Sequence, residues 1–470
     1  MAMSFIAKPT GFHPAYNTTK FIVDSTNKNS TAFEYIFQVF ESGTANEIGN
    51  YAVKPRFGDG YGEIDLSELL SAKLTSEIEN ADATSFYDAL HSYYKYDVKI
   101  GERYIVSTAY TSSLTNSGGF VRVNVTHSYS LGDQVYITQA DGGAANTQVE
   151  GYQTITAVGV GYFDINVAWS TVTDATINGS IKYADNRRTS TLNVISDLNK
   201  YVFNGVFDTV GMVNYTPNTY DLNSVNDKAL TVLPSSNYLI GKSAPLVLNF
   251  RTQSSGSGSI RFANSNGDVL ELGMVTTTEI TAVNCGTYNT PTLSVVSGTN
   301  PLVKPTTEWY EVYYYNGSQK SQKYRVNINQ DCEIEPYSLL FVDQLGSLIS
   351  LPFTLKAREL MDIKRETYNR DLVGQVTGGQ WKPLVIEGSI TQVNSSQAKR
   401  LELNSPYVSD EMSELYYQLH ASPSVVLFDG SNFIPCVLEN NSVQLKRRNT
   451  DKLIQYSVTI RYSNNEKING

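Results

Sequence analysis

The sequence predicts a mainly β protein made of several β-sandwich or barrel domains with a few short helices. Apolar and polar residues alternate over most of the 470 residues, as they do in strands with one buried face. Asn-Gly signals at 266–267 and 316–317 separate strand-sized segments and are typical of hairpins with type I′ turns. Helical spacing of apolar residues is clear only near 65–74 and 409–420, so we expect fewer than about a fifth of the residues to be helical.

Residues 1–118 are predicted to form an N-terminal β-domain with one short helix. The segment 33–40 is apolar in both registers, which predicts a strand that is buried on two faces. A glycine-rich turn at 58–62 follows, and leucines at helical spacing come directly after it. A strand-to-helix turn explains these glycines better than a phosphate-binding loop does.

Residues 119–184 contain five strand-sized segments separated by turns rich in Gly, Asp and Asn. Five short strands in so few residues predict a compact β-barrel. The apolar residues that alternate with polar neighbours in its strands are Val121, Val123, Val125, Phe163, Ile165, Val167 and Trp169. Polar stretches flank the segment, so we expect an inserted module whose two ends approach each other.

The rest of the chain is predicted to form a β-meander or sandwich at 185–336 and an α+β domain at 337–470. SSGSGS at 254–259 is favoured as a hairpin tip over an interdomain linker. Ser409 is a plausible N-cap for the helix at 409–420, which Pro423 ends. The closing strands are predicted to direct inward Val443, Leu445, Val458 and Ile460.

The composition of the chain argues against several classes of function. The net charge is −10, from 36 Lys plus Arg against 46 Asp plus Glu, which argues against direct nucleic-acid binding. No stretch approaches 18 consecutive apolar residues and the first residues lack the pattern of a signal peptide, so no membrane span and no secretion are predicted. Cys285, Cys332 and Cys436 have no paired spacing and are predicted to be buried free thiols.

A catalytic or metal-binding constellation is not visible in the sequence. The four histidines have no zinc-site spacing, and no nucleophile elbow or P-loop occurs, so we predict no enzyme activity, no cofactor and no metal. Two acidic clusters could supply a glycosidase pair but are favoured as solvated surface: Asp59, Glu63, Asp65 and Asp331, Glu333, Glu335. Fragments of calcium-loop pattern at 59–62 and 429–432 are read as turns.

Tyrosine is the residue type that stands out, with 32 copies. Tyrosine offers a large amphipathic contact area, which suits subunit interfaces and also stacking on sugars. The alternative is that alternate tyrosines of each run line strand cores. The candidate interface residues are Tyr93, Tyr94, Tyr96, Tyr313, Tyr314, Tyr315, Tyr416 and Tyr417.

Several stretches carry a resemblance to a known family. They are FHPAYNTTKFIVDSTNKNSTAFEYIFQVFESG with KPRFGDGYGEIDLSELL, then YVFNGVFD with a downstream ALTVLP, CEIEPYSLLFVDQLGSLISLPFTLKARELMDIKRETY and LELNSPYVSDEMSELYYQLHASPSVVLFDG. Together they resemble tail-, neck- or baseplate-type virion structural proteins of tailed bacteriophages that infect Bacteroidota, of the crAss-like or flavobacterial-phage type. The segment 119–184 also looks like the small β-modules inserted into phage tail proteins. At 341–347 the chain reads FVDQLGS, where the family resemblance would lead us to expect a polar FLNRLGG.

The resemblance implies a structural subunit of a virion, made in the host cytoplasm, whose partners are copies of itself in a symmetric ring and other tail or neck proteins. The composition favours the same conclusion, because interfaces are depleted in Lys, Glu and Asp and enriched in Tyr. Two alternatives remain open: an adhesin of the virion that binds host-surface glycan, and a virion glycosidase.

Overall fold

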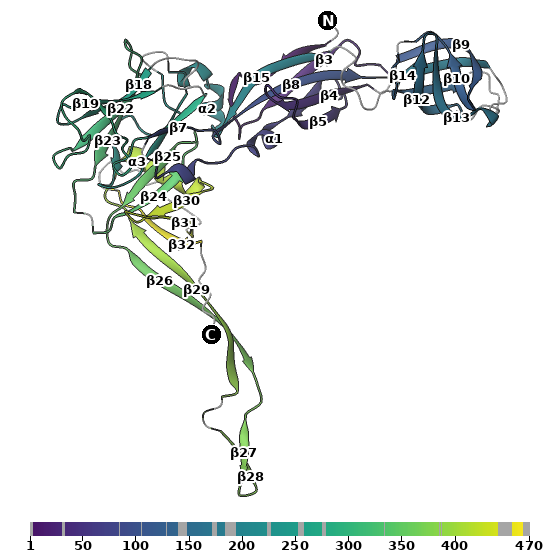
Figure 1. Cartoon of the computed structure of the whole chain (residues 1–470). Helices are drawn as coiled ribbons and strands as arrows, with labels where there is room; N and C mark the ends of the chain where they lie inside the picture. Colours follow the sequence, from purple (N-terminus) through teal and green to yellow (C-terminus); the bar gives the residue numbers. More distant parts are fainter. Residues whose placement is uncertain are drawn as a thin grey trace. The chain divides into compact units, whose positions relative to one another are not determined.

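The computed structural model describes residues 3–30, 33–83, 85–104, 106–127, 129–139, 148–171, 176–183, 194–222, 227–251, 258–274, 279–332, 334–384, 386, 388–439 and 454–463. Strands make up 51% of the described residues and helices 8%, which confirms the mainly β prediction and the low helix content. The chain forms two compact units (Figure 1). Unit 1 is Met1–His13, Thr18–Ser71 and Lys95–Val202, and unit 2 is Pro14–Asn17, Ala72–Tyr94 and Phe203–Gly470.

Unit 1 contains two open sheets and one closed barrel. The first sheet has the order β1 (Met3–Ala7), β3 (Lys20–Ser25), β6 (Gly62–Asp65). The second has the order β2 (Phe12–Pro14), β15 (Ile195–Phe203), β8 (Tyr93–Arg103), β4 (Glu34–Glu41), β5 (Glu47–Val53). The consecutive residues Tyr35, Ile36 and Phe37 of β4 are all buried, so this strand is covered on both faces as its sequence predicts.

The barrel closes six strands on one another, in the order β10 (Phe120–Asn124), β13 (Tyr162–Ala168), β12 (Gly151–Gly159), β11 (Gln134–Gln139), β14 (Thr176–Tyr183), β9 (Val106–Ser117). Six of the seven alternating residues belong to its buried core, whereas Trp169 lies in the turn after β13 and packs against that core while only partly buried. The barrel starts at 106 and not at 119, because β9 pairs with both β10 and β14. Val106 and Tyr183 are partners in that pairing, so the two ends of the barrel lie side by side.

Unit 2 is built on two large sheets. The ten-stranded sheet has the order β26 (Arg358–Asn369), β29 (Ile390–Asn404), β32 (Ser457–Tyr462), β31 (Phe433–Leu438), β30 (Val425–Phe428), β24 (Tyr337–Val342), β25 (Leu348–Phe353), β17 (Val247–Arg251), β20 (Ile280–Asn284), β7 (Phe86–Asp88). The six-stranded sheet has the order β16 (Tyr238–Ile240), β23 (Tyr324–Ile328), β22 (Trp309–Tyr315), β18 (Gly258–Asn264), β19 (Val269–Met274), β21 (Ser294–Ser297). A two-stranded sheet joins β27 (Gly374–Thr377) to β28 (Gln380–Pro383). One hydrophobic core takes side chains from both large sheets.

The helices of the described residues are short. The α-helices are α1 (Ser67–Ser71), α2 (Thr209–Val213) and α3 (Asp410–Ala421), and the 3₁₀ turns are η1 (Ile78–Asn80), η3 (Trp169–Thr171) and η4 (Pro217–Tyr220). The Ser409 side chain accepts a hydrogen bond from Met412 N, which confirms the predicted N-cap of α3. The helix packs its apolar side chains into the core of unit 2 and ends before Pro423. The helix predicted over 65–74 is shorter, at Ser67–Ser71.

The structure divides the chain differently from the predicted domain boundaries. The boundary at 336/337 falls inside unit 2, because β17 pairs with β25 and one core spans both sides. The predicted 1–118 domain is also too short, since β15 completes its sheet from beyond the barrel. Both differences arise from pairing between distant strands, which local alternation does not reveal.

Two smaller predictions were wrong. The strands that flank 254–259 belong to different sheets, β17 to the ten-stranded sheet and β18 to the six-stranded sheet, so they form no hairpin. The hairpins at 266–267 and 316–317 exist, but only their glycines have positive φ, so neither turn is type I′.

In the closing strands, Val458 and Ile460 are buried as predicted, whereas Val443 and Leu445 lie outside the described residues.

The cysteine prediction was correct for two of the three residues. Cys285 and Cys436 are buried free thiols, and Cys332 is an exposed free thiol. Burial raises the pKa of Cys436 to about 12, so its thiol stays protonated. Cys332 lies in the loop between β23 and β24, where no packed layer covers it.

Candidate functional site

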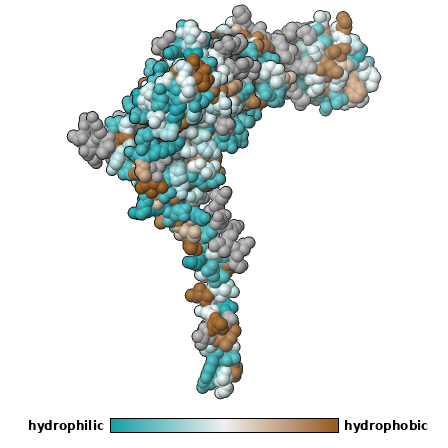
Figure 2. All heavy atoms as spheres, turned by 60° about the vertical axis from the view of Figure 1, so that its left-hand side comes forward, coloured by the Kyte–Doolittle hydropathy of each residue, from teal (hydrophilic) through white to brown (hydrophobic). Residues whose placement is uncertain are grey.

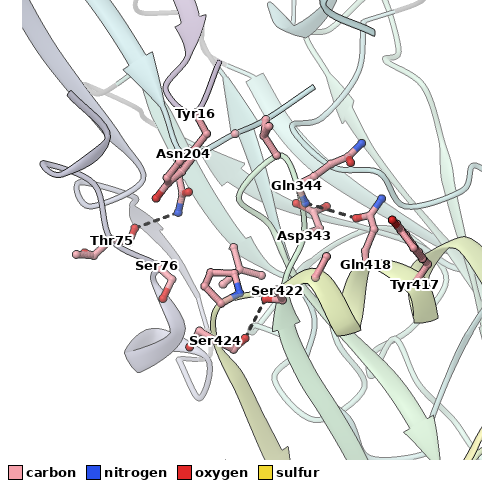
Figure 3. Close-up of a pocket in the computed structure, with 15 residues that line it drawn as sticks. Tyr16, Thr75, Ser76, Asn204, Asp343, Gln344, Tyr417, Gln418, Ser422 and Ser424 are labelled. Atoms are coloured by element: carbon pink, nitrogen blue, oxygen red, sulfur yellow. Dashed lines mark hydrogen bonds between the residues drawn. The ribbon is translucent and has the colours of Figure 1, made fainter. Parts of the chain in front are cut away.

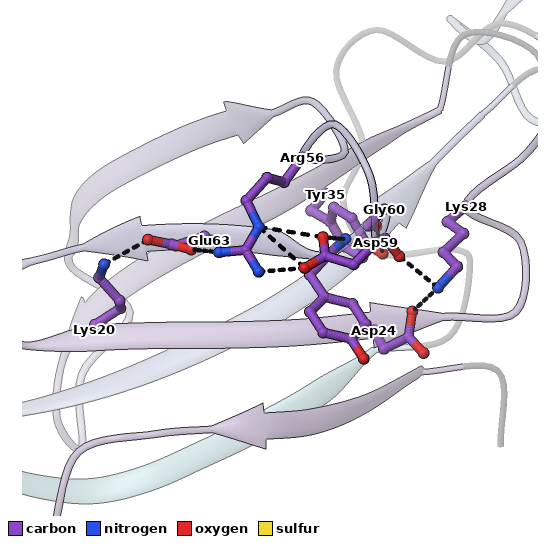
Figure 4. Close-up of polar contacts among 9 residues, drawn as sticks. Lys20, Asp24, Lys28, Tyr35, Arg56, Asp59, Gly60 and Glu63 are labelled. Carbon is purple, nitrogen blue, oxygen red and sulfur yellow. Dashed lines mark hydrogen bonds and ion pairs between the residues drawn. The ribbon is translucent and has the colours of Figure 1, made fainter.

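The first acidic cluster lies in unit 1, in and after the glycine-rich turn (Figure 4). The Asp59 carboxylate pairs with the Arg56 guanidinium, and Glu63 accepts hydrogen bonds from Arg56 Nη1 at 2.6 Å and Lys20 Nζ at 2.5 Å. Gly60 has a φ of +74°, and its carbonyl accepts a hydrogen bond from the Tyr35 hydroxyl. The turn therefore ties β6 to its neighbours through polar contacts.

These carboxylates are poorly suited to general acid catalysis. The hydrogen bond from Arg56 holds the pKa of Asp59 at about 2, and the hydrogen bond from Lys20 lowers the pKa of Glu63. A glycosidase acid needs a raised pKa. The third member, Asp65, accepts hydrogen bonds from the backbone N–H groups of Thr19 and Ser67, so it holds the chain where α1 begins.

The second acidic cluster lies on the loop between β23 and β24. Glu333 is outside the described residues, Asp331 is exposed and Glu335 is half-buried. At 429–432 the Asp429 carboxylate accepts hydrogen bonds from the backbone N–H groups of Ser431 and Asn432, so this segment is a turn. Among the described residues, no group of three or more His, Cys, Asp or Glu is arranged to hold a metal ion.

Four of the eight candidate interface tyrosines are buried within a single copy of the chain. Tyr96, Tyr313, Tyr314 and Tyr416 are at most 6% exposed. Tyr416 stacks on Tyr456 with ring centroids 4.6 Å apart and an interplanar angle of 12°. Assigning these four to a subunit interface was therefore wrong, because the sheets of their own chain already cover them.

The other four candidates retain accessible surface. Tyr93, Tyr94 and Tyr315 are half-buried, and Tyr417 is 48% exposed. The Arg261 guanidinium lies 3.6 Å from the ring centroid of Tyr315, which occupies one face of that ring. For these residues the role in subunit contact stays a prediction, and Tyr417 has the largest free surface of the four.

Tyr417 lines a pocket of about 620 Å³ in unit 2 (Figure 3). The pocket lies among the C-terminal end of α3, the turn between β24 and β25, and segments around Tyr16, Thr75 and Asn204. Backbone hydrogen bonds fix these segments: Tyr16 N donates to Gly205 O at 3.2 Å, and Val206 N donates to Gln344 O at 2.7 Å. The walls are thus held by the backbone.

The chemistry of the pocket is neutral. Its lining is made of tyrosine, aliphatic, amide and hydroxyl side chains, with Asp343 as the one carboxylate among the described lining residues. Asp343 is only 4% exposed and accepts four hydrogen bonds: from Thr231 Oγ1, Val232 N, Leu345 N and Ser347 N. Burial nevertheless raises its pKa to about 6. In this chain, the aspartate of FVDQLGS therefore holds the turn in place.

The second feature of interest is a two-stranded ribbon, which the periodicity of the sequence did not predict. Strands β26 and β29 pair over twelve residues, and beyond the segment of β29 that also pairs with β32 they leave the ten-stranded sheet as a two-stranded ribbon (Figure 1). Every residue of β26 is exposed. We call residues 358–399, which include β27 and β28 at the far end, the arm.

The arm exposes a large share of apolar surface. Among the described residues, 32 large apolar side chains are exposed, and eleven of them lie on the arm. They are Leu360, Met361, Ile363, Tyr368, Leu372, Val373, Val376, Trp381, Ile386, Ile390 and Val393. Figure 2 shows some of them in brown along the arm. A third of the exposed large apolar side chains thus lie on less than a tenth of the chain.

Comparisons with known proteins give no basis for assigning a fold or a function to this chain. No protein-family model matches the chain, and no curated protein matches it. Among solved structures it is similar to a phage phi92 endosialidase, with 8% sequence identity and a TM-score of 0.19 over 98% of this chain and 69% of that chain. A TM-score at this level supports no inference about fold or function. No helix of the described residues is long and apolar enough to cross a membrane.

Proposed function

We propose that this chain is a structural subunit of a bacteriophage virion that assembles with copies of itself into a symmetric ring in the tail, neck or baseplate. The virion part of the proposal rests on the family resemblance of the sequence. The self-assembly part rests on one structural observation, the exposed arm.

A two-stranded ribbon is marginally stable alone in water, because each strand leaves one edge of backbone groups unpaired and no second layer covers its faces. Among the described strands, the arm is two-stranded over residues 361–369 of β26, where β29 no longer pairs with β32. Exposed apolar groups such as Ile390, at 66%, and Val393, at 65%, add to the cost of leaving it in water. A partner that covers the arm would remove both costs.

A second copy of the chain is the partner that the composition favours. Only 17% of the residues are charged, and a low charge density is what extensive contact between copies would leave in a composition. An arm that binds a different surface of the next copy makes a head-to-tail contact. Contacts of this kind form rings when they close.

A structural role requires no catalytic group, and we propose none. The described members of the acidic clusters form ion pairs, hold backbone turns or lie on a loop, as shown above for Asp59, Glu63 and Asp65. The glycan-binding alternative would need an exposed aromatic surface that stays free in the assembled particle.

Electron microscopy of the intact particle tests the proposal. We expect the subunit in a closed ring, with each neighbouring pair burying more than about 1,000 Å² in total and with the arm inside that interface. If neighbouring copies bury less than this area, or if the chain is absent from the particle, the proposal is wrong.

A further inference from the structure

The far end of the arm is a small apolar surface that carries no charge. From Leu372 to Trp381 the sequence contains no charged residue. Val376 and Trp381 are partners across the β27–β28 hairpin, so both side chains lie on the same face, and they are 73% and 53% exposed. Gly378 and Gly379 form the turn with φ values of +64° and +74°, which keeps the end of the hairpin slender.

The position of Trp381 is fixed before any partner binds. A Cβ atom at Gly374 would lie 2.5 Å from the indole of Trp381, so the ring lies directly against the backbone of Gly374. A glycine diagonally across from an aromatic residue leaves room for the ring to lie over the ribbon, and here it gives Trp381 a defined position. Little side-chain entropy then remains to be lost on binding, which favours an anchor.

The pocket of unit 2 is complementary to the end of the arm in size and in its lack of charge. Its volume, about 620 Å³, is within the range of sites that enclose a drug-sized ligand, so it has room for an indole and a valine side chain. Three exposed apolar side chains line it: Tyr16 at 52%, Val206 at 39% and Tyr417 at 48%. Apart from the buried Asp343, its described lining carries no charge that an apolar insert would have to desolvate.

We infer that the end of the arm, residues 372–381, inserts Val376 and Trp381 into the pocket of unit 2 in a second copy of the chain. Trp and Tyr are the residues most enriched at the energetic centres of interfaces, and they tend to meet one another across an interface. The inference rests on the self-assembly in the proposed function and specifies which two surfaces meet.

The geometry of the arm is consistent with a contact between copies. The nine residues 361–369 of β26, which lie beyond the part of β29 that pairs with β32, span about 30 Å at the usual rise, so the hairpin is carried well away from the base of the arm. The described residues that line the pocket include none from the arm of the same chain. Each copy therefore offers one insert and one receptor, which is the arrangement that gives head-to-tail contacts.

Photo-crosslinking tests the inference in the full chain. A benzophenone amino acid replaces Trp381, and copies labelled with ¹⁵N are mixed with unlabelled copies at high concentration before irradiation. Mass spectrometry then identifies the joined peptides and their isotopes. We expect crosslinks from position 381 to the segments around Tyr16, Val206 and Tyr417, with one labelled and one unlabelled peptide in each pair.

A matched pair of variants supplies the energetic test. Trp381→Ala should weaken self-association at least about 30-fold in sedimentation experiments, the loss typical of an interfacial anchor. Phe57→Ala is the control, because Phe57 is fully exposed, lies in unit 1 and takes no part in the proposed contact. It should leave self-association unchanged.

Several results would overturn the inference. They are crosslinks only within one copy, crosslinks to another surface of the second copy, no intermolecular crosslinks, or equal effects of the two variants. Binding of a neutral oligosaccharide to the pocket in place of the arm would overturn it as well. A ring with a large interface and an empty pocket would leave the proposed function intact, whereas a pairwise interface below about 1,000 Å² would refute the ring itself.

Discussion

Replacing Gly346 by alanine should destabilise unit 2 for two separable reasons. Gly346 lies in the turn between β24 and β25 with a φ of +90°, a conformation that costs an L-residue about 1–3 kcal/mol. A Cβ at this position would also lie 2.6 Å from the carbonyl oxygen of Asn204, which is backbone and moves only with its loop. Relieving such an overlap costs roughly another 1–3 kcal/mol.

Gly317→Ala is the matched control. Gly317 has nearly the same φ, +94°, but a Cβ there would meet nothing within 4 Å. Urea unfolding followed by circular dichroism and tryptophan fluorescence gives the free energy of unfolding of both variants. We expect Gly346→Ala to be less stable than Gly317→Ala by about 1–3 kcal/mol. Equal losses would show that close approach to Asn204 does not require a glycine, and would refute this reasoning.

Three further predictions concern titration, the barrel and its ion pair. Asp343→Asn should remove a pH dependence: the folded carboxyl titrates at about 6 and the unfolded one near 3.8, so wild-type stability should fall by about 3 kcal/mol as the pH rises between these values. Urea unfolding from pH 4 to 7 measures this, and identical slopes for both proteins would contradict it. Deleting 106–183 and closing the gap with a short Gly/Ser bridge should leave the remainder folded, because the barrel ends lie side by side; loss of cooperative unfolding in the remainder would count against a separate module. Arg122→Met should lower the thermal unfolding temperature of the barrel, because it leaves the Asp164 carboxylate without its two hydrogen bonds from Arg122; thermal unfolding with no change would show that the pair contributes nothing.

The features that the sequence predicts correctly are those determined by nearby residues. The helix α3 was found from a capping serine and apolar residues at helical spacing, all within one stretch of chain. The barrel strands were found from alternation, and five of the six strands were anticipated. The missed strand, β9, pairs with β14 more than sixty residues later, and nothing in its own alternation marks that partner.

The arm shows why part of the candidate site could not be predicted. Its strands expose both faces, so they lack the single apolar face that alternation detects. The dipeptide Gly378-Gly379 is a hairpin signal, and it could have located the turn although not the length of the ribbon. The tyrosine prediction failed for Tyr96 and Tyr416 because residue type does not distinguish a core position from a surface position.

The strand β7 has a consequence for how the protein is made. It belongs to unit 2, yet it precedes most of unit 1 in the chain, and Asp88 meets its partner Thr281 about 190 residues later. At ribosomal rates of roughly 5–20 residues per second, β7 waits about 10–40 s for the strand that it pairs with. The barrel and the sheets of unit 1 can be completed in that interval. Synthesis thus imposes an order in which the sheets and barrel of unit 1 can form before the ten-stranded sheet of unit 2 is complete.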